Sequence, residues 1–176
     1  LASGATIYMG SFIWGIEAAV NNAAYLGAAS GDELVITHIS NNTSSKSATA
    51  EEAGVAQVDA NVAVVTKNGD MITSCIIDAV QSKAEFGADG VVTTEAGNVA
   101  SKNQLGENYG MKGFSGIGKE WNEQAAAFAA YVTGKTAEEV AGTALTETTA
   151  PAEADLASSV TISVGGFMAL IEKIAK

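Results

Sequence analysis

Residues 1–20 have the sequence LASGATIYMGSFIWGIEAAV, and residues 156–175 have the related sequence LASSVTISVGGFMALIEKIA. Aligned without a gap, the two stretches match Gly10 with Gly165, Phe12 with Phe167, Ile16 with Ile171 and Glu17 with Glu172. Such a match predicts an internal repeat that relates the first helix of the chain to the last. Each copy has a polar turn, a short β-branched piece and then apolar residues at helical spacing, which is typical of a helix packed on a core.

The polar turn of the first copy is Ser3-Gly4-Ala5-Thr6. It resembles the covalent flavin-attachment motif of FMN-binding domains, such as those of sodium-pumping NADH:quinone reductase and Rnf complexes. That motif is Asp, two variable residues, Ser or Thr, Gly, Ala, and then Thr or Ser, and a flavin transferase joins FMN to the last residue through a phosphoester bond. The resemblance therefore implies FMN on Thr6, with Ser3, Gly4 and Ala5 as the turn. Small side chains in this turn let an enzyme and a phosphate approach the backbone.

The second copy departs from the motif. It has the motif's aspartate, as Asp155, and an acceptor-like Thr161, but it has Ser159-Val160 where the motif has Gly-Ala. In the first copy the aspartate would stand directly before Leu1. We therefore expect Thr161 to belong to a degenerate copy that is not flavinylated.

The resemblance divides the chain into two parts. Residues 1–30 form a flavin-attachment-like turn and helix, and residues 31–176 form a diverged FMN-binding-like domain. The terminal segment either folds back on its own domain or packs on a neighbouring chain, and the sequence leaves both arrangements open.

The composition limits the classes of function. The chain has 176 residues, of which 47% are hydrophobic, and this length suits one ordinary domain with a sizeable core. Nine lysines oppose 20 acidic residues, giving a net charge of -11, so no basic stripe is present to bind nucleic acid. Abundant small residues and few charges are common in secreted and cell-surface bacterial proteins, so we expect an extracellular or cell-surface location.

The local patterns predict an α+β fold, in which helices pack on a small twisted antiparallel sheet. The clearest pattern is a hairpin with Asn68-Gly69 at the centre of its turn. The expected strands are residues 34–39, 56–66 and 71–80, with a second pair formed by 82–86 and 91–94. The expected helices are residues 10–26, residues 117–133, a short helix opened by Thr136, and the last helix of the chain.

Residues 96–118 are rich in glycine and asparagine and predict a long loop, which in a compact domain is often functional. In a flavin domain this loop would cover the isoalloxazine ring, with Tyr109 or Met111 against the ring and Lys112 near a phosphate. The alternative is a surface loop whose Tyr109 and Met111 fill the edge of the core.

Catalytic and metal-binding patterns are missing from the sequence. His38 is the only histidine and is expected to be a surface or packed side chain. Cys75 is the only cysteine, and its apolar surroundings predict a buried, structural thiol. We therefore expect an electron carrier or a structural protein rather than a turnover enzyme.

The sequence is compatible with two functions. The first is an extracytoplasmic electron-transfer protein that carries FMN on Thr6, with a flavin transferase as its maturation partner and a redox partner that the sequence does not specify. The second is a structural subunit of a bacterial surface layer or extracellular filament, built as a homo-oligomer or polymer on a degenerate FMN-binding fold. We favour the first because a specific motif supports it.

Overall fold

A computed structural model describes residue 4, residues 6–94 and residues 99–175 of the chain. The helices are α1 (Gly10–Asn21), α2 (Lys102–Leu105), α3 (Trp121–Val132), α4 (Ala137–Ala141), α5 (Ala154–Ala157) and α6 (Gly165–Glu172), with 3₁₀ helices η1 (Gly106–Tyr109) and η2 (Lys173–Ala175). The strands are β1 (Glu33–Asn41), β2 (Gly54–Asn68) and β3 (Met71–Phe86). They form one antiparallel sheet in the order β1-β2-β3, so the fold is α+β, as the sequence predicts.

The sheet is built around the long hairpin of β2 and β3. Asn68 pairs with Met71, so the loop between the strands is Gly69-Asp70, one residue further along than the predicted centre. Gly69 has φ of 59°, a backbone conformation that glycine adopts without a steric penalty. β1 pairs with β2 from Glu33 opposite Lys67 to Asn41 opposite Asp59.

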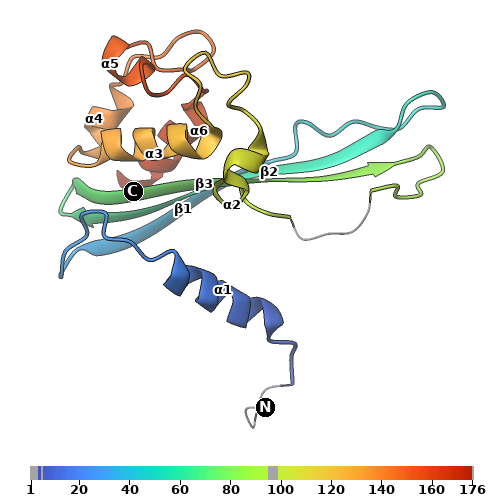
Figure 1. Cartoon of the computed structure of the whole chain (residues 1–176), viewed down its shortest axis with the longest axis horizontal. Coiled ribbons are helices and arrows are strands. Elements are labelled where there is room, and N and C mark those ends of the chain that lie inside the picture. The colour runs from blue at the N-terminus through green and yellow to red at the C-terminus, as the bar shows by residue number, and fades with distance from the viewer. Residues whose placement is uncertain (1–3, 5, 95–98, 176) are drawn as a thin grey trace.

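One face of the sheet carries the core. Figure 1 shows α3, α4, α5 and α6 on the same side of the sheet. The core residues of α3 include Trp121, Phe128 and Val132, which lie at helical spacing on one apolar stripe, and all three are buried. Phe167 of α6 meets the rings of Trp121 and Phe128 with 5.6 Å between centroids in each pair, so α3 and α6 share one aromatic cluster.

The other face of the sheet is open to solvent and partly apolar. Strand side chains alternate between the faces, so Ile36, Val64 and Ile76, which are paired across the three strands, share one side. Ile36 is 63% exposed and Ile76 is 46% exposed. The neighbouring Ile77 points to the covered face and is only 3% exposed.

The first helix is separate from this core. α1 is shorter than the predicted helix because it ends at Asn21, and it has no buried residue. Figure 1 shows α1 on the side of the sheet opposite to α3 and α6. The linker after α1 is held at the sheet, because the Asp32 carboxylate accepts hydrogen bonds from the Ala29 amide, the Thr73 hydroxyl and the Asn68 side chain.

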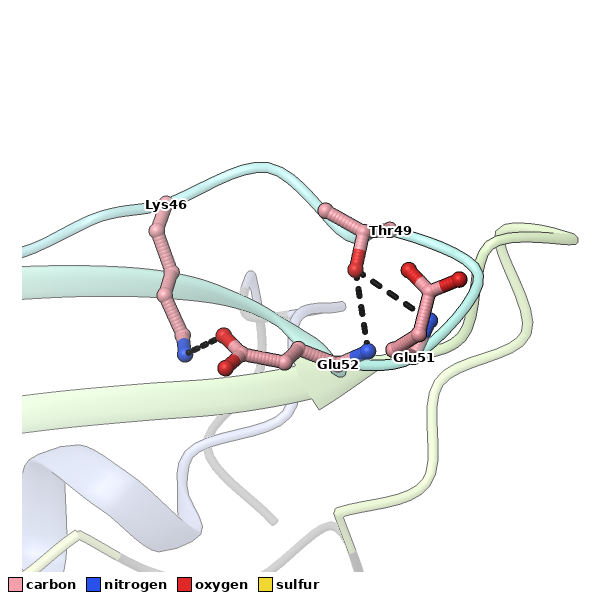
Figure 2. Close-up of polar contacts among 4 residues, drawn as sticks. All are labelled: Lys46, Thr49, Glu51 and Glu52. Atoms are coloured by element: carbon pink, nitrogen blue, oxygen red, sulfur yellow. Dashed lines mark hydrogen bonds and ion pairs between the residues drawn. The ribbon is translucent and has the colours of Figure 1, made fainter.

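The sheet extends past the helical layer as a thin arm, which Figure 1 shows at the right. The connection from β1 to β2 turns at the tip of this arm. There the Thr49 hydroxyl accepts hydrogen bonds from the amides of Glu51 and Glu52, and Lys46 Nζ lies 3.2 Å from Glu52 Oε2 (Figure 2). These are local turn contacts of an exposed loop, and an exposed ion pair of this kind contributes little to stability.

Two sequence expectations differ from the structure. Residues 82–86 are not a separate strand, because they continue β3 opposite β2. Residues 91–94 turn back on the end of β3, as predicted, through the antiparallel bridge between Phe86 and Val92 and the hydrogen bond from the Thr93 amide to the Glu85 carbonyl, but they form no strand of their own. The helix expected from residue 117 begins at Trp121, because Glu120 has the extended backbone of an N-cap residue. The internal repeat is not confirmed and stays a prediction.

Candidate functional site

Two polar side chains hold the predicted loop and the turn of the second copy, which contains Thr161, in place by hydrogen bonds. Glu120 and Gln124 lie at the start of α3, and they are 3% and 0% exposed. Buried polar groups are stable only when they are hydrogen-bonded, so their partners show what they hold in place.

Glu120 holds the loop before α3. Its Oε2 accepts a hydrogen bond from the Met111 amide at 2.8 Å, and its Oε1 accepts one from the Lys112 amide at 3.0 Å. A carboxylate that accepts two backbone N–H groups fixes the backbone of both residues. Glu120, the residue directly before α3, therefore anchors the backbone of Met111 and Lys112.

Gln124 joins the same loop to the second threonine turn. Its Nε2 donates to the Ser115 hydroxyl at 3.2 Å and to the Lys119 carbonyl at 3.1 Å. Its Oε1 accepts from the amides of Thr161 and Ile162 at 2.8 and 3.2 Å and from the Thr161 hydroxyl at 3.2 Å. One buried amide therefore brings loop and turn together, although they are far apart in the sequence.

The three loop residues predicted to cover a flavin have other contacts. The Tyr109 hydroxyl donates to Gln81 Oε1, and Lys102 Nζ lies 4.7 Å from the centre of the Tyr109 ring. Met111 is half-buried against the core, and the exposed Lys112 ammonium lies 3.8 Å from Glu107. Tyr109 and Met111 therefore lie at the edge of the core, as the alternative prediction for this loop states.

Thr161 lies beside this loop. Its hydroxyl is bonded to Gln124, yet the residue is exposed. The structure thus brings Thr161 together with Met111 and Lys112 through Gln124 and Glu120, whereas Thr6 lies elsewhere.

Thr6 precedes α1 and is exposed. Gly4 has φ of 100°, so the backbone here takes the left-handed form that glycine favours and other residues rarely adopt. Ser3 and Ala5, the other two turn residues, lie outside the described residues. Among the described residues, no hydrogen bond links Thr6 to Tyr109, Met111 or Lys112.

A hollow next to the start of α1 supplies aromatic side chains nearer to Thr6. Its volume is about 660 Å³, and Tyr8 and Trp14 line one side of it. Val99, Ala100 and Gln104 line the other side. Sequence reasoning missed this hollow, because its second wall comes from residues far from α1 in the sequence.

The residues present fit FMN in part. An exposed threonine hydroxyl after a left-handed glycine suits phosphoester attachment, so Thr6 and Gly4 match what the resemblance implies. Tyr109, Met111 and Lys112 do not lie over Thr6 of the same chain. Tyr8 and Trp14 are the aromatic side chains that this chain offers near that hydroxyl.

Other reactive groups are structural or exposed. Burial raises the pKa of the Cys75 thiol to about 12, so the thiolate that acts as a nucleophile is disfavoured. Hydrogen bonds, first from Thr73 and then from the Ala29 amide, lower the pKa of Asp32. Within residues 6–94 and 99–175, no cluster of three or more His, Cys, Asp or Glu side chains is placed to hold a metal ion.

Glu120 and Gln124 are the site residues that sequence reasoning overlooked. A usable signal exists for Gln124, since it lies three residues after Trp121 and four before Phe128, on the apolar stripe of α3. A polar residue on such a stripe indicates a buried hydrogen-bonding role. Glu120 gives no comparable signal, because acidic residues are common at exposed helix starts.

No helix within the described part of the chain is long and apolar enough to cross a membrane.

Comparisons with known proteins identify no relative of this chain. No protein-family model matches the sequence, no curated protein matches it, and no solved structure matches the fold.

Proposed function

We propose that this chain is an extracytoplasmic flavoprotein that carries FMN on Thr6 and transfers electrons. The observation that carries the proposal is the exposed hydroxyl of Thr6, which follows the left-handed Gly4 in a turn that resembles the flavin-attachment motif. Bound FMN supplies one-electron and two-electron transfer, while the protein holds it and tunes its potential. The chain itself contributes the attachment oxygen and the aromatic side chains of Tyr8 and Trp14.

The attachment reaction needs a flavin transferase and a flavin nucleotide with a pyrophosphate bond. The Thr6 oxygen forms a bond to the FMN phosphorus, and the pyrophosphate bond of the donor breaks. The nucleotide leaving group departs, and the hydroxyl proton passes to a base of the transferase. Because Thr6 is exposed, the transferase can reach this residue without unfolding the rest of the chain.

Co-expression with a flavin transferase tests the proposal. We would express the chain with one aspartate placed before Leu1, which completes the motif, and measure the intact mass after denaturation. The expected gain is FMN minus water, about 438 Da, together with flavin absorbance that stays with the chain. Thr6→Ser keeps an acceptor hydroxyl and should keep the gain, whereas Thr6→Val should lose it.

A matched variant at the second turn completes the test. Thr161→Val should leave the mass gain unchanged, because its turn has Ser159-Val160 in place of Gly-Ala. An unmodified mass for the aspartate-extended chain with Thr6 retained, or a gain that survives Thr6→Val, would overturn the assignment to Thr6.

The second candidate is a structural subunit of a surface layer or filament. It is favoured by the apolar surface that the chain leaves uncovered: Phe12 is 57% exposed and Ile16 is 67% exposed on α1, and Ile36 is 63% exposed on the open sheet face. Large exposed apolar surfaces usually mark interaction sites. Electron microscopy of the protein from its natural source tests this candidate, since regular polymers support it and dispersed single particles contradict it.

A further inference from the structure

The helices α1 and α6 resemble each other in conformation as well as in sequence. Nine of the 17 positions in residues 1–17 are identical to those in residues 156–172. α1 begins at Gly10 and α6 begins at the matched Gly165. The residue before each helix has nearly the same backbone, with φ −101° and ψ 0° at Met9 and φ −109° and ψ 6° at Val164.

α6 closes the core of the body formed by β1 and the elements that follow it. It packs across β1 and β2 and against α4. The Thr37 hydroxyl of β1 donates a hydrogen bond to the Leu170 carbonyl at 3.0 Å, and Lys173 Nζ donates to the His38 carbonyl at 2.7 Å. Phe167 completes the aromatic cluster with Trp121 and Phe128.

The same positions of α1 are in solvent. Exposure is 40% at Met9, 57% at Phe12 and 67% at Ile16, whereas it is 0% at Val164, 3% at Phe167 and 0% at Ile171. Side chains that form core in one copy of the pattern are therefore uncovered in the other. Burying apolar side chains of this kind is favourable, so a surface that covers α1 would stabilise it.

Each chain has two helices with this sequence pattern, α1 and α6, but only one surface on β1, β2 and α4 that such a helix can cover. That place is filled by α6, which covalent connection keeps at high local concentration. We propose that α1 binds a second copy of this body in the place that α6 occupies here, when that copy's own α6 does not fill it. The proposed interface would repeat the contacts that α6 makes within its own chain, because the matched side chains of α1 would meet the same strands and the same aromatic residues.

Docking of this kind would complete the flavin site, and this step rests on the proposed function. Thr6 matches Thr161, so the docked Thr6 would lie at Gln124 of the second body, beside its Met111 and Lys112. Thr161 is exposed as a residue, although its hydroxyl donates a hydrogen bond to Gln124. The attachment residue and the loop predicted to cover the flavin would then come from two copies.

Two differences between the copies bear directly on how well α1 fits. Gly15 stands where α6 has the fully buried Leu170, and Trp14 stands where α6 has Ala169. The missing leucine leaves space in the second body, which weakens the fit. A Gly15→Leu variant restores that side chain and serves as the second variant in the test.

A fused chain tests the proposal directly. Residues 31–155 are joined to the start of the full chain, so that Asp155 precedes Leu1 as it naturally precedes Leu156. The upstream body then lacks its own closing helix, and α1 of the full chain is next in sequence. We would compare amide hydrogen exchange of residues 10–21 in the fused and unfused chains, with and without Gly15→Leu.

The expected result is exchange of the α1 amides about 100-fold slower or more in the fused chain, with an upstream body that is folded. Ile16→Lys should abolish this protection, because the matched Ile171 is fully buried. Ala18→Lys should leave it intact, because the matched Lys173 is exposed. Equal exchange rates in the fused and unfused chains, both with Gly15 retained and with the Gly15→Leu substitution, would overturn the proposal.

The outcome is separate from that of the flavin test. Hydrogen exchange reports docking of α1, and intact mass reports attachment of FMN. Expression without a flavin transferase leaves Thr6 unmodified, so the protection of α1 in the fused chain is measured independently of FMN attachment. Loss of flavin with retained protection would therefore contradict the proposed function alone.

Discussion

Among single residues, Gln124 makes the most demanding set of contacts. Its side chain is fully buried and serves the amides of Thr161 and Ile162 and the carbonyl of Lys119. Gln124→Leu removes these partners while keeping the apolar volume, and we expect it to lower the free energy of unfolding by about 2–4 kcal/mol. Urea unfolding followed by circular dichroism measures the change.

Thr161→Val is the control for this prediction. It removes one hydroxyl contact to Gln124 and leaves both amide contacts, so the expected loss is about 1 kcal/mol or less. A Gln124→Leu protein as stable as the wild type would show that loop and turn do not depend on this side chain.

Cys75 makes stability depend on alkaline pH. Burial raises the pKa of its thiol to about 12, above the value of the unfolded chain, so the folded state holds the proton more tightly. The contribution to stability is fully present below the unfolded pKa and is lost as pH rises toward 12, with a slope of about 1.4 kcal/mol per pH unit. Unfolding curves of wild type and Cys75→Ala should therefore converge or cross between about pH 9 and about pH 12, whereas a constant difference would contradict the burial of the thiol.

For the secondary-structure elements, the contrast between α1 and α6 gives a matched pair of substitutions. Phe167→Ala opens a cavity in the aromatic cluster and should lower the free energy of unfolding by about 3–5 kcal/mol. Phe12→Ala alters a solvent-exposed side chain and should change it by about 0.5 kcal/mol or less. Thermal and urea unfolding of the two variants measure this, and a large loss from Phe12→Ala would show that α1 packs on its own body.

The elements show how far sequence reasoning reaches. The hairpin of β2 and β3, the helix after Glu120 and the short helix capped by Thr136 follow from alternation, apolar stripes and capping residues, and these signals are local. The predicted end of α1 at residue 26 was wrong, since the helix ends at Asn21. Residues 82–86 were predicted as a separate strand, but they continue β3, because pairing with β2 decides their course. The apolar pattern of α1 predicts a helix equally well whether or not a core covers it.

The candidate site divides in the same way. The sequence identified Thr6, Thr161 and the loop residues Met111 and Lys112 from the motif and from loop composition. It did not predict that Gln124 joins Thr161 to the loop, since that contact links residues 37 positions apart. Long-range hydrogen bonds of this kind leave only an indirect trace in the sequence.

For the whole molecule, the layering makes adjacent positions of β3 respond differently. Ile76 faces the open side of the sheet and is 46% exposed, whereas Ile77 faces the helices and is 3% exposed. Ile76→Lys should change the free energy of unfolding by about 1 kcal/mol or less. Ile77→Lys buries an unpaired charge and should cost about 4 kcal/mol or more, enough to unfold a marginally stable protein.

Solution behaviour gives a second readout of the same pair. Ile76→Lys should also reduce binding of an apolar dye, because it places a charge in an exposed apolar patch. Equal stability losses for the two lysine variants would contradict a sheet that is covered on one face only.

The central claim is that this molecule is a carrier of covalently bound FMN, and the intact mass of the protein from its natural source tests it most directly. The protein is denatured, weighed and scanned for visible absorbance, and the modified peptide is then sequenced. We expect an excess of about 438 Da, flavin absorbance that stays with the chain, and a modification on Thr6. A colourless chain of unmodified mass would contradict it.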